Sequence, residues 1–540
     1  MRRLLIYLCV FILFSCCTQY RKYENLEVLC KVWGFVKYHH PAFADPTTDA
    51  DMELFELLPL VADAGELERN RILSEWITGL GEFKENKARY DSIENTPDCR
   101  LLADLKWIDD SKVLGRELSD KLKSLRYADR SDNRYVRYES ELLDCSNEKK
   151  YDVKYSAISF RLLALFRYWN LIEYYSPYRD LTDKDWSDVL TEYLPLFVDS
   201  DDVRSYRLSV FRLFTELCDS HAIPESSFIF GSRYIPVEAQ MINGKLIVKS
   251  IEKYAPLGST GLLPGDEILK IDENRVRDIE NNVKRYVSSS TKAHRLRACS
   301  FYALESRYDT ANICYKRDGV IQNSLCSTVP VFDIYPLMLK QDDYYRNLGD
   351  SIGYLHLGGY KEDMAIYDSI EKTKAIVIDL RTCPTNDVFG LVKDYFFPDS
   401  YQITTLTLPI KYLPGYFKKC DQYFGKGNNT KHYSGKIIVL VNEETQSAAE
   451  HYTMALQAIP GTVVIGSETS GADGNVVRTY LPGGILVSFS GIGVYYPDGT
   501  PIQRIGVKID EVVKPTIQGI KEGRDEVLER AIEIIKESGS

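Results

Sequence analysis

Two uninterrupted apolar runs near the carboxyl end constrain the fold of this chain most strongly. They are KAIVIDL at residues 374–380 and KIIVLV at residues 436–441. Runs rich in β-branched residues, without polar alternation, are typical of strands buried on both faces of a sheet. From Ala448 to Ile459, directly after the second run, apolar residues recur at helical spacing. The sequence therefore predicts an α/β fold here, with both runs as central strands.

Ser447 stands at the turn between the second run and this helix. A hydroxyl at such a place lies beside free backbone N–H groups and the positive end of the helix dipole, which suit an oxyanion. A serine at the start of a helix also commonly caps that helix. Position alone leaves both roles open, so the surrounding sequence has to decide between them.

The amino-terminal half contains a degenerate internal repeat. WGFVKYHHP at residues 33–41 and WNLIEYYSP at residues 169–177 share their Trp, apolar, Tyr and Pro positions at an offset of 136. The same offset relates LPL at 58–60 to LPL at 194–196. Apolar residues lie at helical spacing in both copies, which predicts two related helical segments, near 23–90 and 155–222.

The two copies differ where they end. Ser220 and His221 close the second copy, whereas Phe83 and Lys84 stand near the same place in the first. This asymmetry indicates that the second copy serves chemistry and the first serves packing. A lone histidine near a helix end is more often structural than catalytic, so a catalytic role for His221 requires a partner elsewhere in the chain.

A β-rich stretch with glycine turns follows, with short apolar runs at 245–248 and 267–271. At its centre, GLLPGDEIL at residues 261–269 resembles the PDZ signature, in which a Gly-Asp turn leads into a core strand. PDZ modules bind extended peptides at an open sheet edge, so the resemblance implies peptide docking. A PDZ fold that only spaces its neighbours is the alternative.

Several motifs after residue 440 have the order and spacing of one peptidase family. They are SAAE at 447–450, VIGSETSGA at 464–472, LPGG at 481–484, YPDG at 496–499 and GRDEVL at 523–528. Together they resemble the C-terminal processing (tail-specific) serine peptidase family. The resemblance implies a crotonase/ClpP-like α/β peptidase core, in which Ser447 is the nucleophile.

The general base separates two branches of that family. Many members use a lysine about 25 residues after the serine, but Ala472 stands there in this chain. The tricorn-like branch instead takes a histidine, preceded by a serine, from the helical region, and Ser220 and His221 match that pattern. An imidazole accepts the hydroxyl proton near neutral pH and returns it to the leaving amine. The resemblance thus implies that His221 is the base and that Ser220 orients it.

Two departures from the family pattern concern the surroundings of the site. Gln503 stands where the family has a glutamate that orients the second serine, and an amide forms hydrogen bonds but carries no charge. A polar residue at a strand edge is the other interpretation of Gln503. Pro384, in the loop after the first run, has no N–H for an oxyanion, which leaves the Ala448 N–H as the expected donor. Nothing marks Cys383 as reactive, so we expect a buried thiol.

The first residues are typical of an export signal. Arg2 and Arg3 precede an apolar run of eleven residues, 4–14, which is too short to span a bilayer. The run ends at Ser15 and Cys16, which resembles the bacterial lipobox and implies that Cys16 is acylated. An ordinary signal peptide with incidental cysteines is the alternative. The prediction is a lipoprotein of the bacterial cell envelope, on the periplasmic or outer-membrane face, held to the membrane by its lipid.

Composition and motif spacing exclude other classes. The formal net charge is −11 and no basic arm is present, which disfavours a nucleic-acid partner. The twelve cysteines form no C-x-x-C motif, and the remaining histidines form no metal-binding pattern, so we expect neither metal nor cofactor. The histidines in question are His39, His40, His294, His356, His432 and His451.

The prediction is therefore a multidomain α/β protein that acts as a lipid-anchored envelope serine endopeptidase on polypeptide substrates. Its oligomeric state stays open. A catalytically weakened peptide-binding or scaffold protein with the same fold is the main alternative, and a coenzyme-A-binding crotonase-type enzyme is a third. The expected parts are a signal peptide (1–15), a helical domain with the first repeat copy (16–150), a helical domain contributing the histidine (151–230), a PDZ-like domain (231–330) and a peptidase core (331–540).

Overall fold

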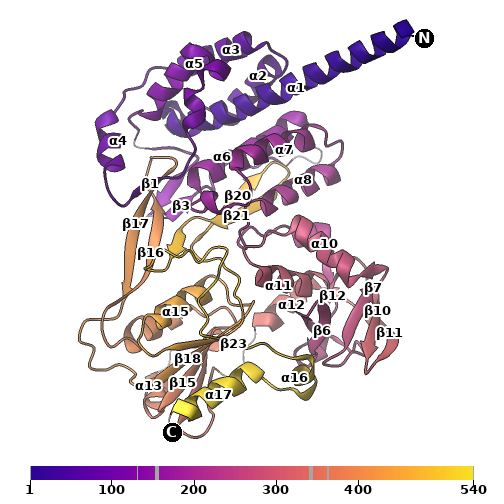
Figure 1. Ribbon diagram of the computed structural model, residues 1–540, viewed down its shortest axis with the longest axis vertical. Helices are drawn as coiled ribbons and strands as arrows, with labels where there is room; N and C mark the ends of the chain where they lie inside the picture. Colours follow the sequence, from indigo (N-terminus) through magenta and orange to yellow (C-terminus); the bar gives the residue numbers. More distant parts are fainter. Residues whose placement is uncertain are drawn as a thin grey trace. The chain divides into compact units, whose positions relative to one another are not determined.

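The computed structural model describes residues 2–130, 132–140, 142–152, 157–339, 344–361 and 364–538. The side chains of residues 2–18, Cys16 among them, lie outside this description. The chain forms two compact units (Figure 1). The helical unit comprises Met1–Leu217, Thr407–Cys420 and Asn475–Ile492, and the sheet unit comprises Cys218–Leu406, Asp421–Gly474 and Gly493–Ser540.

Two successive groups of helices and a hairpin build the helical unit. The first group is α1 (Arg2–His39), α2 (Ala50–Val61), α3 (Glu66–Gly79), α4 (Lys87–Glu94) and α5 (Ser111–Arg126), and the second is α6 (Ile158–Tyr175), α7 (Trp186–Val198) and α8 (Val203–Thr215). The hairpin of β20 (Val476–Leu481) and β21 (Ile485–Ser490) packs beside the second group, where Tyr206 donates a hydrogen bond to the Pro482 carbonyl at 2.7 Å. Within the described part of the chain, no helix has the length and apolar character needed to cross a membrane.

The internal repeat predicted from the sequence is visible as a repeated hydrogen bond. The indole of Trp33 donates to the carbonyl of Ala50 at 2.7 Å, and the indole of Trp169 donates to the carbonyl of Trp186, also at 2.7 Å. Both pairs obey the 136-residue offset, and each ties the long helix of its copy to the first residue of the next helix. The two predicted helical segments are therefore confirmed.

The two copies also meet at equivalent positions. Gly34 of α1 faces Asn170 of α6, and a Cβ atom added at Gly34 would lie 1.9 Å from the Asn170 side chain. Asn170 is fully buried and donates to the carbonyl of Cys30 at 3.0 Å. The close approach of α1 and α6 thus requires a residue without a side chain at position 34.

A six-stranded, mostly parallel sheet forms the centre of the sheet unit. Its order is β13 (Tyr345–Asn347), β14 (Ile352–His356), β15 (Ala375–Asp379), β18 (Lys436–Val441), β19 (Val463–Gly466) and β23 (Glu511–Val512), with β13 alone antiparallel to its neighbour. The two apolar runs are β15 and β18, which are central strands as the sequence predicts, and the structure places them next to each other in the sheet. Helix α17 (Glu526–Ser538) packs apolar residues such as Val527 and Ala531 against strand residues such as Val377 and Ile438.

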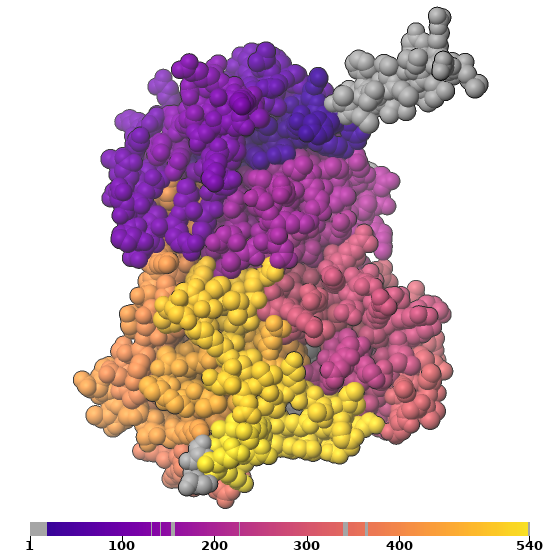
Figure 2. Space-filling view, in the orientation of Figure 1, coloured from indigo at the N-terminus to yellow at the C-terminus, as the bar shows by residue number. Residues whose placement is uncertain are grey.

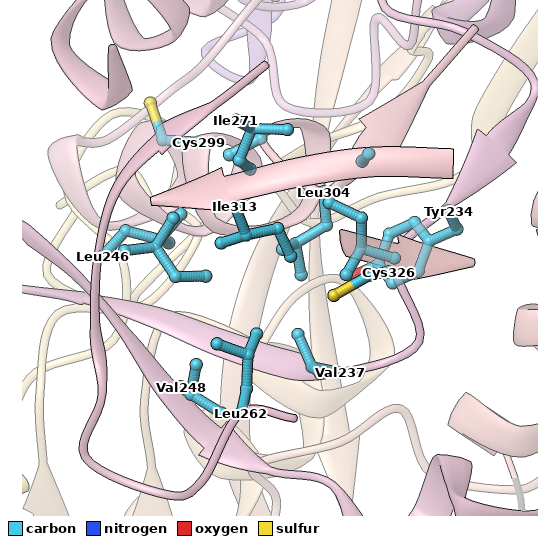
Figure 3. Close-up of a cluster of buried hydrophobic side chains, with 14 of the residues drawn as sticks. Tyr234, Val237, Leu246, Val248, Leu262, Ile271, Cys299, Leu304, Ile313 and Cys326 are labelled. Carbon is cyan, nitrogen blue, oxygen red and sulfur yellow. The ribbon is translucent and has the colours of Figure 1, made fainter. Parts of the chain in front are cut away.

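A second, antiparallel sheet forms the β-rich module of the same unit. Its order is β11 (Val320–Ser327), β10 (Thr310–Arg317), β7 (Glu267–Ile271), β6 (Lys245–Ser250) and β5 (Glu238–Ile242). Figure 3 shows the apolar core of this module, where Leu246, Val248, Leu262 and Ile313 gather with residues of the neighbouring elements. The strands predicted at 245–248 and 267–271 are confirmed as β6 and β7.

Two helices tie the β-rich module to its surroundings. Helix α11 (Lys292–Tyr302) covers the edge strand β5, where the Met241 N–H donates to the Ser300 hydroxyl at 2.9 Å. Helix α16 (Ile517–Glu522), near the carboxyl end, packs Ile520 against Ile242 and Ile247. Figure 2 shows these carboxyl-terminal residues, in yellow, against the magenta and pink surface of the module.

The close contact between the two repeat copies predicts that a side chain at position 34 destabilises the protein. In the Gly34→Ala variant the added methyl group would force Asn170 or the α1 backbone to move, because the site is fully packed. We expect a loss of about 1 to 3 kcal/mol in the free energy of unfolding. Urea denaturation followed by circular dichroism measures this loss. The Gly79→Ala variant, where a Cβ atom at the end of α3 meets nothing within 4 Å, is the control and should be at least as stable as wild type.

Candidate active site

Ser447 occupies a strained turn between β18 and α15 (Ala448–Gln457). Its backbone angles are φ 56° and ψ −122°, outside the regions that residues with side chains normally adopt. Such a conformation costs on the order of 1 to 3 kcal/mol and persists only when neighbours impose it. A sharp strand-to-helix turn that presents a serine at the end of a buried strand is the geometry of a nucleophile elbow. The predicted position of Ser447 at a strand-to-helix turn is confirmed.

A buried carboxylate holds this turn in place. Glu450, fully buried, accepts hydrogen bonds from the backbone N–H groups of Ser447 (3.3 Å), Gly471 (2.7 Å) and Ala472 (2.9 Å), and from the Thr469 hydroxyl. Burial raises the pKa of Glu450 to about 7, although these donors oppose the rise. The carboxyl group therefore joins the nucleophile turn to the segment that follows β19.

Hydrogen bonds on either side of Ser447 complete the support of the turn. The Thr445 hydroxyl donates to the carbonyl of Leu380, at the end of β15, at 2.8 Å. The Ser470 N–H donates to the Thr445 carbonyl at 3.0 Å, and the Ser447 N–H donates to the Ala472 carbonyl at 2.9 Å. The turn is thus fixed between two neighbouring strands of the sheet.

The segment that carries the predicted base reaches this turn from 226 positions away. The Gln446 side chain, next to Ser447, donates to the carbonyl of Ser220 at 3.3 Å. The Ser220 hydroxyl donates to the carbonyl of Ser470 at 3.1 Å. Ser220 and His221 are both buried, at 1% and 5% exposure. The structure therefore brings the Ser220–His221 segment against the nucleophile turn, while the catalytic role of His221 stays a prediction.

Gln503 joins the same network through an intermediary. Its amide nitrogen donates to the Ser290 hydroxyl at 3.1 Å and to the Cys218 carbonyl at 3.2 Å. Ser290 in turn exchanges two hydrogen bonds with Ser220, since its hydroxyl accepts from the Ser220 N–H and its own N–H donates to the Ser220 hydroxyl, each at 2.9 Å. The sequence interpretation missed Ser290. A serine-rich connection before α11 was the only local signal for it.

Asp219 is a second neighbour of the site that the sequence interpretation did not single out. Its Oδ1 accepts the His221 backbone N–H at 2.9 Å and lies 3.9 Å from the His221 ring Nδ1. The Asp219 N–H donates to the Ser288 hydroxyl at 3.0 Å. An acidic residue two positions before the histidine was visible in the sequence, but its proximity to the ring depends on the turn at residues 218–221.

The opposite side of the nucleophile turn holds the expected oxyanion donor. Ala448 is the first residue of α15, where a backbone N–H has no acceptor within the helix.

The neighbouring loop after β15 is fixed by Arg381, which pairs with Asp379 at 2.6 Å and with Asp525 at 2.7 Å. Burial opposes the charge of Asp379, but Arg381 lowers the pKa of Asp379 to about 2.

Cys383 in the same loop corrects one expectation from the sequence. The residue is exposed, whereas a buried thiol was expected. The loop is irregular, and the residue before Cys383 is the anchored one, because the Thr382 hydroxyl lies 3.1 Å from Nε2 of the buried His356.

Two further side chains lie close to the turn. Arg297 of α11 donates to the Gln446 side chain at 2.7 Å and pairs with Glu444 at 2.7 Å, so the β-rich module contacts the nucleophile turn directly. His451 of α15 lies 2.9 Å from the Asp473 carboxylate. Burial lowers the pKa of His451, but Asp473 outweighs it and the net shift is upward.

Residues 351–513 match the family model "Peptidase family S41". This core of the chain is therefore similar to peptidase family S41. The match contains Ser447, Ala448 and Gln503, whereas Ser220 and His221 lie outside it. The predictions of a serine peptidase of the tail-specific family and of a multidomain α/β fold are confirmed. No curated protein sequence matches the chain.

Several solved structures are similar to this chain at low sequence identity. Mature CPAF complexed with lactacystin aligns over 70% of this chain and 98% of its own, with 15% identity and a TM-score of 0.55. A putative peptidase from Parabacteroides merdae aligns over 70% and 97%, with 16% identity and a TM-score of 0.43. The photosystem II D1 C-terminal processing protease aligns over 68% and 98%, with 14% identity and a TM-score of 0.39. At these identities only the CPAF similarity bears on this chain, and it supports a shared fold.

The raised pKa of Glu450 gives the S41 core a testable pH dependence. A carboxyl group whose pKa is higher in the folded state contributes stability that is fully present below about pH 4.5 and is lost as the pH rises towards about 7. In Glu450→Gln an amide N–H₂ group faces backbone N–H donors, so we expect a loss of about 1 to 3 kcal/mol at pH 5. This loss should shrink as the pH rises to 7, because only the wild type loses the Glu450 contribution. Urea unfolding at pH 5, 6 and 7 measures it, and a loss that grows with pH would contradict the assignment.

Proposed function

We propose that this S41 protein is a serine endopeptidase that cleaves polypeptides through an acyl-enzyme intermediate formed on Ser447, with His221 as general base. The observation that carries the proposal is the hydrogen bond from Gln446 to the Ser220 carbonyl at 3.3 Å, which joins the histidine segment to the residue beside the strained serine. Strain at Ser447, with φ 56°, supports the nucleophilic role, because residues held in such conformations cluster at active sites.

The reaction follows from the roles of these groups. The Ser447 oxygen attacks the peptide carbonyl carbon while the His221 ring accepts the hydroxyl proton. The tetrahedral oxyanion lies against the Ala448 N–H and the positive end of the α15 dipole. His221 then passes the proton to the leaving amine as the C–N bond breaks. A water molecule, deprotonated by His221, hydrolyses the acyl ester and restores the Ser447 hydroxyl.

Ser220 and Gln503 support His221 in this proposal without touching the substrate. The Ser220 hydroxyl is bound between the Ser470 carbonyl and the Ser290 N–H, which fixes the backbone on which His221 is carried. Gln503 holds Ser290 from the opposite side. The two residues act as positioning residues.

In the same proposal the β-rich module docks the polypeptide substrate. The module resembles a PDZ domain in its Gly-Asp turn, and its edge strand β5 lies beside α11. The Met241 N–H on this edge donates to Ser300, so a peptide that adds a strand there has to displace the Ser300 hydroxyl. Because α11 also carries Arg297, docking takes place next to the nucleophile turn.

One specific departure favours a second candidate function, a catalytically weakened peptide-binding protein. Pro384 offers no N–H to an oxyanion, and loss of one such donor lowers rates by about 100- to 1000-fold. Cleavage and covalent labelling separate the two candidates. The peptidase cleaves polypeptides and reacts with a serine-directed probe, whereas a protein that binds peptides but shows neither cleavage nor labelling across pH 6 to 9 is the second candidate.

The proposed location is the bacterial cell envelope, with the protein held to the membrane through a lipid on Cys16. Arg2 and Arg3, the apolar run at 4–14 and Ser15 before Cys16 support the proposal. A lipid on the mature amino terminus would leave the peptidase core outside the bilayer.

Substitution of the two catalytic residues tests the proposed chemistry. Ser447→Ala and His221→Ala should each lower the cleavage of fluorescently labelled casein by on the order of 10⁴-fold. Ser447→Ala should also abolish labelling by a fluorophosphonate probe. The control variants Ser92→Ala and His432→Ala, which alter residues outside the proposed site, should match wild type. A Ser447→Ala protein that cleaves or is labelled normally would refute the assignment.

The lipid anchor is tested with the pair of adjacent cysteines. In Cys16→Ser no thiol remains at the lipobox position, so the protein expressed in a bacterial host should lose incorporation of an alkyne fatty acid and leave the membrane fraction. Cys17→Ser should keep both properties. Equal incorporation in the two variants would contradict the assignment of Cys16.

A further inference from the structure

We propose that Asp219 is the positioning residue that supplies a negative charge beside the His221 ring. Gln503 is uncharged and cannot take this role. This inference rests on the proposed function, in which His221 is the base of Ser447. In this chain the negative charge then comes from the histidine segment itself and not from position 503.

Asp219 and His221 form a close and buried pair. Asp219 Oδ1 accepts the His221 backbone N–H at 2.9 Å and lies 3.9 Å from the ring Nδ1. The side chains are 3% and 6% exposed. Water screens such a pair poorly, so a carboxylate at this distance favours the imidazolium form that develops when His221 takes the Ser447 proton. The same hydrogen bond to the backbone sets the direction of the turn that carries the ring.

Contacts from two other segments fix the position of this carboxylate. The Asp219 N–H donates to Ser288, and the next N–H, that of Ser220, donates to Ser290. The Cys218 carbonyl accepts from Gln503, and Cys218 itself has a positive φ of 54°. The turn at residues 218–221 is therefore held from outside in a conformation that directs Asp219 back towards the ring.

Three other described groups of this region, His294, Arg297 and Gln503, do not supply this charge. His294 of α11 interacts electrostatically with His221, and burial, Arg297 and His221 together hold the pKa of His294 well below its ordinary value, so His294 is neutral. Arg297 is positive and paired with Glu444. Gln503 is buried and donates only from its amide to Ser290 and the Cys218 carbonyl. Gln503 thus maintains the shape of the turn, and Asp219 supplies its charge.

The Asp219→Asn variant separates charge from shape. Asparagine keeps a side-chain oxygen that accepts the His221 N–H, so the turn is retained while the charge is lost. We expect kcat/KM for labelled casein to fall by on the order of 10- to 100-fold, mainly through kcat. The acid limb of the pH–rate profile should move to lower pH, because the imidazolium loses a stabilising charge. Asp278→Asn, an exposed aspartate of the same unit, is the matched control.

A purely structural role gives a different result. If Asp219 served only as a backbone acceptor, Asp219→Asn would leave the acid limb unchanged, and that outcome overturns the proposal. Should Asp219→Asn fail to fold, Asp219→Glu and Asp219→Gln form a second pair that differs in charge alone. The acid limb should stay near wild type in the Glu variant and move to lower pH in the Gln variant, and identical limbs overturn the proposal.

A spectroscopic titration keeps this test independent of hydrolysis. In ¹⁵N-histidine-labelled protein carrying Ser447→Ala, the ring signal of His221 should titrate at a lower pH when Asp219→Asn is added. Equal titration midpoints overturn the role of Asp219 even if the enzyme is active. Conversely, a wild-type protein that neither cleaves casein nor reacts with a fluorophosphonate refutes the proposed function, while the titration still decides whether Asp219 acts on His221.

Discussion

The buried carboxyl group of Glu450 is the interaction on which the rest of the site depends. Ser447 adopts a backbone conformation that is unfavourable by itself, and its N–H, together with those of Gly471 and Ala472, converges on this one side chain. A carboxyl group with several backbone donors offsets local strain, because breaking one bond leaves a buried donor unpaired. Ser447 is therefore held at the carboxyl end of β18 by Glu450 of α15 and by the segment that follows β19.

Much of the framework around this carboxyl group could be predicted from the sequence. The strands β15 and β18 are continuous runs rich in β-branched residues. Strands that are buried on both faces of a sheet typically have this apolar composition, so the runs could be recognised in the sequence. The repeat could be recognised because Trp33 and Trp169 stand at the same place in the two copies. The indole of each donates the same hydrogen bond to the start of the next helix, at the same spacing. These features are local or periodic, so the residue pattern along the chain is enough to predict them.

The parts that sequence could not predict are contacts between stretches without periodicity. Ser290 exchanges hydrogen bonds with Ser220 across 70 positions, and it also accepts from Gln503 across 213. A serine that serves as both donor and acceptor in such a network looks, in the sequence, like any loop serine. Cys383 illustrates the same limit, because exposure of one residue in an irregular loop follows from the anchoring of its neighbour Thr382.

The contacts of the histidine segment also determine which part of the chain contains the site. The last helix of the second repeat copy, α8, belongs to the helical unit, whereas the end of that copy, from Cys218, belongs to the sheet unit. Residues 218–220 form hydrogen bonds there with five partners, which are Ser288, Ser290, Gln446, Ser470 and Gln503. Each of these partners is itself a residue of the sheet unit. The contacts that bring residues 218–220 against the nucleophile turn thus lie within one compact unit.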